Sequence, residues 1–186
     1  SDLLFNDGTN IGIGTTAPGY ELDVNGDINT SGNYSLDDSP VLDVVNTDTL
    51  LVGHNTGNSL VAGADYNTFI GDSAGYSANS LAADYNTFVG QNAGYNLTEG
   101  FNNTTLGSYA GYNLTSGYSN VFIGNAAGSG GSPITGGYNI AIGEHAGEDL
   151  TSENNNILIG YYATINTAGI EDSIVMATNG GYATAD

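Results

Sequence analysis

A short pattern of polar and apolar residues recurs six times between residues 67 and 160. Each copy is Asn, two variable residues, an apolar residue and Gly, followed three residues later by Ala and, in the first five copies, by a second Gly. Weaker copies flank the array at residues 50–53 and 173–177. The six leading glycines lie 17 or 19 residues apart, at Gly71, Gly90, Gly107, Gly124, Gly143 and Gly160. A short fixed period predicts a solenoid in which each copy forms one coil.

The three residues before each leading glycine have the alternation of a short strand, and both faces of that strand are apolar. The first and third positions share one face because side chains alternate along a strand, and we expect this face to be the interior of the coil. The middle position then faces outward. Its large members are Leu51, Phe69, Phe88, Phe122 and Leu158. A strand that is apolar on both faces is normally covered on both, so these five residues are the predicted inter-chain interface of an oligomer.

The pattern therefore predicts an all-β fold, a parallel β-roll or β-solenoid with 17–19-residue coils. Residues 1–48 form a predicted non-repeating β leader, residues 49–177 the β-roll repeats, and residues 178–186 a C-terminal cap or linker. Within the leader, strands are expected near residues 10–13, 20–24 and 27–36, with Asn25-Gly26 as a hairpin turn signal. Residues 40–45 supply an apolar run into the first coil.

The small and polar columns of the repeat fit a narrow coil. The alanine column suits a position that turns inward with little room, and the glycine after it suits positive φ or close backbone approach. The asparagine column can satisfy corner amides and stack from coil to coil. A second apolar contact in each coil is expected from Leu97, Leu114, Ile134 and Leu150, each of which precedes Thr.

The leader and the repeats together resemble segments of bacteriophage tail fibres of the kind that end in a self-cleaving intramolecular chaperone. The resemblance is carried by the segments at residues 10–18, 22–28, 32–36 and 40–42 and by the Asn-x-x-Ile/Val-Gly-x-x-Ala-Gly coils. The coils are more loosely similar to the head repeats of trimeric autotransporter adhesins. The resemblance implies a homotrimer of β-rolls on an elongated fibre, at the virion surface or otherwise extracellular. These repeats are scaffolding and leave the attachment partner open.

The charge of the chain argues against two classes of binding partner. The 186-residue chain has 20 acidic residues and neither Lys nor Arg, so its formal net charge is −20. Nucleic acids and anionic membranes are held mainly by basic contacts, so neither is expected as a partner. There is no cysteine and therefore no disulfide or thiol chemistry. No run of 18 apolar residues is present, and membrane insertion is not predicted.

Few residues suggest metal or catalytic chemistry. His54 and His145 fall in variable polar columns that usually face solvent. Carboxylate pairs at residues 37–38, 148–149 and 171–172 are candidate Ca²⁺ ligands, but the twelve-residue calcium loop and the Asp-rich nonapeptide are absent. We therefore predict no catalytic residue, cofactor or metal, with Ca²⁺ as the one open alternative.

One aromatic column is a candidate ligand contact. Tyr76, Tyr95 and Tyr112 all lie five residues after a leading glycine. Such a column either stacks against sugar rings or packs from coil to coil. The sequence thus favours a structural and adhesive fibre segment that mediates attachment to a host cell, with a glycan-binding head as the alternative. A polysaccharide-degrading enzyme using paired carboxylates such as Asp37 and Asp38 is the least favoured hypothesis.

Overall fold

A computed structural model describes residues 4–25, 34–36, 39–45, 48–165 and 169–177. The chain divides into two compact units, Ser1–Gly32 and Asn33–Asp186. The first unit holds three short strands, β1 (Leu4–Asn6), β2 (Ile11–Ile13) and β3 (Leu22–Val24). β2 lies between the other two, antiparallel to β1 and parallel to β3. The predicted strand at residues 10–13 is thus present, whereas the turn predicted at Asn25-Gly26 extends beyond the described residues.

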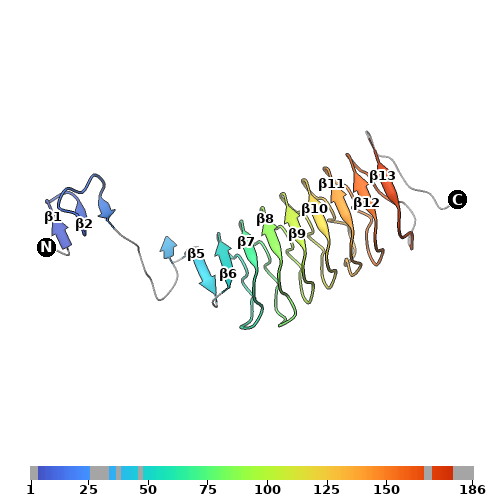
Figure 1. The fold of residues 1–186 in the computed structure, drawn as a ribbon, viewed down its shortest axis with the longest axis horizontal. Coiled ribbons are helices and arrows are strands. Elements are labelled where there is room, and N and C mark those ends of the chain that lie inside the picture. The colour runs from blue at the N-terminus through green and yellow to red at the C-terminus, as the bar shows by residue number, and fades with distance from the viewer. Residues whose placement is uncertain (1–3, 26–33, 37–38, 46–47, 166–168, 178–186) are drawn as a thin grey trace. The chain divides into compact units, whose positions relative to one another are not determined.

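The second unit is a parallel β-solenoid of about seven turns with coils of roughly 17 residues, as the repeat predicts (Figure 1). Eight strands pair in parallel and in register, one strand for each coil. They are β6 (Thr49–Val52), β7 (Thr68–Ile70), β8 (Thr87–Val89), β9 (Thr104–Leu106), β10 (Val121–Ile123), β11 (Ile140–Ile142), β12 (Ile157–Ile159) and β13 (Ile174–Met176). No helix occurs among the described residues.

Two further strands extend this sheet at its N-terminal edge. β4 (Tyr34–Leu36) pairs antiparallel with β5 (Ser39–Val45), and β5 pairs antiparallel with β6. Residues 34–36 and 39–45, which the sequence analysis placed in the leader, are therefore hydrogen-bonded into the coil sheet. The predicted cap or linker at residues 178–186 lies outside the described residues.

The predicted inter-chain interface is wrong, because its side chains form the core of a single chain. Phe69, Phe88, Phe122 and Leu158 are completely buried and Leu51 is 5 % exposed. The rings of Phe69 and Phe88 stack on each other with centroids 4.9 Å apart. The strand alternates as expected, but its middle position points into the coil. Leu97, Leu114, Ile134 and Leu150 are also fully buried, so the second apolar contact of each coil is confirmed.

The columns predicted to be interior point outward instead. Along β10–β13 these outward side chains are all apolar, and along β6–β9 they are threonines and aliphatic residues. Most are half-buried because neighbours in register lie about 4.8 Å apart and cover one another. We call the outward side chains of β10–β13 the outward apolar face. It consists of Val121, Ile123, Ile140, Ile142, Ile157, Ile159, Ile174 and Met176.

A continuous ladder of buried asparagines runs along the solenoid beside the core strand. In its middle, Asn103 Nδ2 donates to Asn86 Oδ1 at 3.1 Å and to Gly117 O at 2.8 Å. Asn103 Oδ1 in turn accepts from the backbone N and Nδ2 of Asn120, at 3.0 and 3.2 Å. The same bonds join Asn67, Asn86, Asn103, Asn120, Asn139 and Asn156. The ladder satisfies the backbone at one corner of six successive coils, as the sequence predicts.

The two glycine columns are required by backbone geometry and by ring packing. The leading glycine Gly71 has φ of 133°, and a Cβ placed there would lie 2.5 Å from the carbonyl oxygen of Gly90 in the next coil. The second glycine, Gly75, also has positive φ, and its Cβ would lie 2.5 Å from the ring of Phe69. Any larger residue at either column would therefore separate the coils or displace the core ring.

Candidate functional site

The tyrosine column predicted as a ligand contact is a continuous stack. Tyr76 and Tyr95 have ring centroids 4.9 Å apart and planes 1° from parallel, and Tyr95 and Tyr112 are 5.1 Å apart at 15°. The ring of Tyr109 tilts against Tyr112 at 5.6 Å. Sugars bind aromatic rings through free faces, and here the rings cover each other's faces. The arrangement agrees with packing from coil to coil and presents mainly ring edges.

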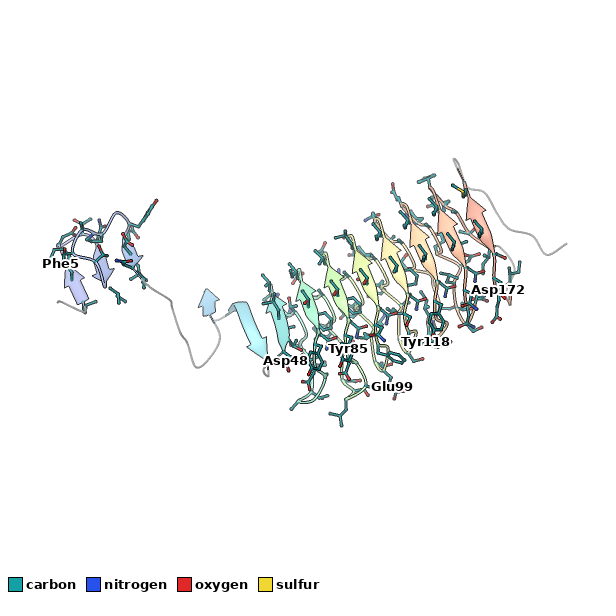
Figure 2. All side chains as sticks on the ribbon, in the orientation of Figure 1. Phe5, Asp48, Tyr85, Glu99, Tyr118 and Asp172 are labelled. Atoms are coloured by element: carbon teal, nitrogen blue, oxygen red, sulfur yellow. The ribbon has the colours of Figure 1, made fainter. Side chains whose placement is uncertain are left out.

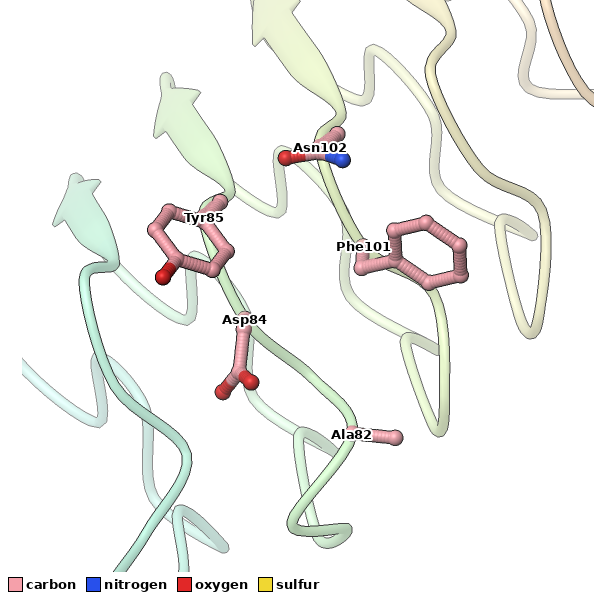
Figure 3. Close-up of a pocket in the computed structure, with 5 residues that line it drawn as sticks. All are labelled: Ala82, Asp84, Tyr85, Phe101 and Asn102. Carbon is pink, nitrogen blue, oxygen red and sulfur yellow. The ribbon is translucent and has the colours of Figure 1, made fainter.

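A different pair of aromatic columns borders a hollow that the sequence analysis did not identify. The hollow has a volume of about 350 Å³ and is lined by Ala82, Asp84, Tyr85, Phe101 and Asn102 (Figure 3). These side chains come from two successive coils, just before strands β8 and β9. They occupy the two positions that precede the ladder asparagines, together with one loop residue. Figure 2 shows the same corner along the whole solenoid, with Tyr85 and Tyr118 labelled.

The two histidines lie in polar surroundings and do not share a site. His54 Nδ1 is 3.2 Å from Asp72 Oδ1, and both side chains are about half exposed or more. His145 Nδ1 is 3.0 Å from Glu148 Oε2, and its ring stacks on Tyr162 at 4.5 Å. Each histidine therefore has a local carboxylate partner, and the two partners are different residues.

The carboxylate pairs that were candidate calcium ligands support the local fold where they are described. Asp149 Oδ2 accepts from the backbone N of Ile165 at 2.9 Å, and Glu171 Oε1 accepts from Asn154 Nδ2 at 2.9 Å. Among the residues with described positions, no three His, Asp or Glu side chains gather as a metal site would require. The pair at residues 37–38 lies outside the described residues.

Glu153 is a buried carboxylate in a column that otherwise holds Ala, Gly or Ile. Its Oε2 accepts from Thr151 N at 2.7 Å and Thr151 Oγ1 at 3.0 Å, and its Oε1 accepts from Gly169 N at 2.9 Å. Burial acts to raise the pKa of Glu153, but the hydrogen bonds from Gly169 and Thr151 outweigh it and hold this pKa below its ordinary value. The ionised side chain thus ties two successive coils together.

Replacing Glu153 by Gln is expected to lower the free energy of unfolding at neutral pH by about 1–3 kcal/mol, because one buried N–H then faces an amide donor. A lowered folded-state pKa means that the contribution of Glu153 is present at neutral pH and is lost as pH falls through that pKa. The difference between the variant and the unmodified chain should shrink in acid, below the ordinary glutamate value of about 4.3. Thermal unfolding followed by circular dichroism across this pH range measures it.

The exposed Glu99 offers a matched control for this prediction. Glu99→Gln removes the same charge from the chain and should change stability little at any pH. A difference for Glu153→Gln that stays constant from neutral to acidic pH would contradict the role given to the ionised carboxylate.

Comparison of the chain with models of protein families, with curated proteins and with solved structures gave no match. None of the described segments is a helix of the length and apolarity that crossing a membrane requires. The site residues can therefore be interpreted only through their own geometry.

The signal that could have located the hollow is a break in two neighbouring columns. The column before the ladder asparagines holds Tyr66 and Tyr85 and then changes to Asn102. The column before that one holds Asp84 and then changes to Phe101. Both changes occur between the same two coils, and sequence reasoning that concentrated on the strand residues missed them.

Proposed function

We propose that this chain is a structural and adhesive segment of an extracellular trimeric fibre, of the tail-fibre or surface-adhesin kind, that takes part in attachment to a host cell. Its role is mechanical. The coils provide a stiff ladder of in-register strands, and copies of the chain associate along the outward apolar face. The resemblance of the repeats and leader to fibre segments supports the proposal together with the distribution of charge and apolar surface.

The observation that carries this proposal is the absence of charge from the outward side of the described coil strands. The chain has 20 acidic residues, yet the outward positions of β6–β13 contain only Thr and apolar residues. Ile174 is 70 % exposed and Met176 is 77 % exposed at the C-terminal edge of this face. A chain that repels its own copies through a charge of −20 leaves this strip as the favourable place for them to meet.

The size of the strip fits an interface that also involves its borders. The outward sides of all eight strands β6–β13, about 4.8 Å apart and three residues wide, form an uncharged strip of about 34 Å by 10 Å, or about 340 Å², and the outward apolar face of β10–β13 makes up about 14 Å of its length. A standard interface buries about 800 Å² on each partner, so the corner residues beside the strands are expected to contribute as well.

Ile142→Glu is expected to dissociate the assembly into single chains of 18.9 kDa. The substitution places a charge in the middle of the outward apolar face, where association would bury it without a basic partner. The interior of the coil is untouched, because Ile142 points outward beside the buried Ala141. Size-exclusion chromatography with light scattering measures the mass, and circular dichroism checks that the coils remain folded.

Ser132→Glu is the matched control, since Ser132 is exposed in the middle of the loop between β10 and β11, away from the strands and their corners. It adds the same charge outside the strip and should leave the mass unchanged. If Ile142→Glu keeps the mass of the unmodified chain, the outward apolar face is not the interface.

A further inference from the structure

Two neighbouring columns, at the two positions that precede the ladder asparagines, hold stacked aromatic residues. The stack in one column ends at Tyr85, and the stack in the other column begins one coil later at Phe101. Tyr85 stacks on Tyr66 of the preceding coil with centroids 4.8 Å apart and planes at 7°, and the following coil has Asn102 in that column. Phe101 stacks on Tyr118 of the following coil at 5.4 Å and 14°, and the preceding coil has Asp84 in that column. Each of these two rings therefore has one stacked face and one face without an aromatic neighbour among the described residues.

The two uncovered ring faces border the same hollow. Figure 3 shows Tyr85, Asn102, Phe101, Ala82 and Asp84 placed around it, with Tyr85 and Phe101 on opposite sides. Tyr85 is 56 % exposed and Phe101 is 40 % exposed, so a ligand can reach both rings. At about 350 Å³ the hollow is within the range of small-molecule sites, about 300–1,000 Å³.

The polar groups of the hollow are held in place by the backbone. Asp84 Oδ1 accepts from the backbone N of Asp65 at 2.8 Å. The backbone N of Asn102 donates to Asp84 O at 3.0 Å, which ties the backbone that carries the Asn102 side chain to the preceding coil. A carboxylate and an amide thus stand at the edges of two apolar ring surfaces.

We propose that this hollow binds a neutral pyranose ring of a polysaccharide or glycan. A pyranose has an apolar face of C–H groups that stacks on an aromatic ring, and equatorial hydroxyl groups at its rim that need acceptors and donors. Tyr85 and Phe101 supply the apolar surfaces, Asp84 supplies an acceptor, and Asn102 supplies both a donor and an acceptor. In small-molecule sites, a small number of polar groups around an apolar hollow usually fixes the orientation of the ligand.

The electrostatic surroundings select against acidic sugars. Asp48 raises the pKa of the Tyr66 phenol, with further contributions from Tyr85, burial, Asp65 and Asp84. The corner thus has a negative potential, and the chain has no Lys or Arg to neutralise a carboxylate ligand. Sialic and uronic acids are therefore expected to bind more weakly than neutral hexoses.

The test is a titration of the full chain followed by saturation-transfer NMR. The ligands are neutral pentasaccharides of glucose, mannose and galactose, the acidic sugar sialyllactose, and tetramethylammonium, a cation that can bind aromatic rings through its charge. At least one neutral sugar should bind in the millimolar range and sialyllactose should not. If no neutral sugar binds, or if only tetramethylammonium or sialyllactose does, the proposal is wrong. The outcome does not depend on the mass of the assembly, so it is separable from the fibre proposal.

Asn102→Tyr and Tyr85→Asn locate the binding. Asn102→Tyr adds a third ring to the Tyr66–Tyr85 stack, and this ring fills the hollow. The backbone tolerates the substitution, because Asn102 has φ of 56° and the native Tyr85 in the same column has φ of 57°. Loss of a stacking surface is expected to weaken binding roughly tenfold in either variant. Tyr138→Asn is the control. Tyr138 lies in the same column as Tyr85, has a similar φ of 59° and is 57 % exposed, but it does not line the hollow. Equal loss in the control, or no loss in the two variants, would overturn the assignment.

Discussion

Phe88→Ala is expected to lower the free energy of unfolding by about 3–5 kcal/mol, the usual cost of removing a buried Phe. Phe88 is completely buried and stacks on Phe69 at 4.9 Å. The cavity cannot be filled by the neighbouring turn, because Gly94 there has no side chain and Ala93 is already packed in the core. Guanidinium unfolding followed by circular dichroism measures the loss.

Two substitutions test whether the loss comes from the inward position. Phe101→Ala removes the same side chain from a position that is 40 % exposed, and should cost about 1–2 kcal/mol, because the ring is only partly buried although it stacks on Tyr118. Thr105→Val changes the core column itself, where the Thr105 hydroxyl is buried without a hydrogen-bond partner. It should be neutral or stabilising. Similar losses for Phe88→Ala and Phe101→Ala would contradict the inward assignment of the phenylalanine column.

Asn103→Asp is expected to destabilise the chain at neutral pH by about 3–5 kcal/mol, as for a buried charge without a partner. The new carboxylate could still accept from Asn120, but it would face Asn86 Oδ1 and Gly117 O, to which the native amide donates. Burial and these two oxygens raise the folded-state pKa of the new carboxyl group above its unfolded value of about 3.9. The penalty is therefore full above the folded pKa and shrinks as pH falls below the unfolded value, where one O–H donor of the protonated Asp replaces the two N–H donors of the native amide.

Asn102→Asp is the adjacent control, since Asn102 is exposed and outside the asparagine ladder. It introduces the same charge and should have a small effect that varies little with pH. Thermal unfolding of both variants from neutral to acidic pH makes the comparison. If Asn103→Asp is no more destabilising than Asn102→Asp, the side-chain ladder does not hold the coils together.

Much of the solenoid follows from the sequence because its constraints are local. Gly71 needs positive φ and close approach to Gly90, and only glycine meets both requirements. Asn103 has an amide that can donate and accept along the stack, so a column of asparagines predicts a ladder. These requirements recur in every coil, and the period therefore shows them directly.

The direction of the strand faces could not be obtained in the same way. Alternation shows which side chains share a face, but it does not show which face is inside when both are apolar. The neighbouring columns held the missing information: Asn67 and Phe69 are two residues apart, so a buried asparagine implies a buried phenylalanine. Gly75 adds to this, because a glycine that makes room for a ring belongs beside the interior.

The candidate site was only partly predictable for a related reason. The stack of Tyr76, Tyr95 and Tyr112 follows from a column that repeats. The hollow beside Tyr85 and Phe101 exists because two columns change between the same coils, and such an interruption has no period. The volume of the hollow depends on how the rings and the loop pack, and residue spacing alone does not predict that packing.

Sedimentation equilibrium of the unmodified chain tests most directly whether its strands are covered on both faces, by their own core inside and by sister chains outside. A mass three times the 18.9 kDa of one chain, unchanged on dilution, is the predicted result. A folded single chain of 18.9 kDa at every concentration would contradict it, because the outward apolar face would then stand uncovered in water.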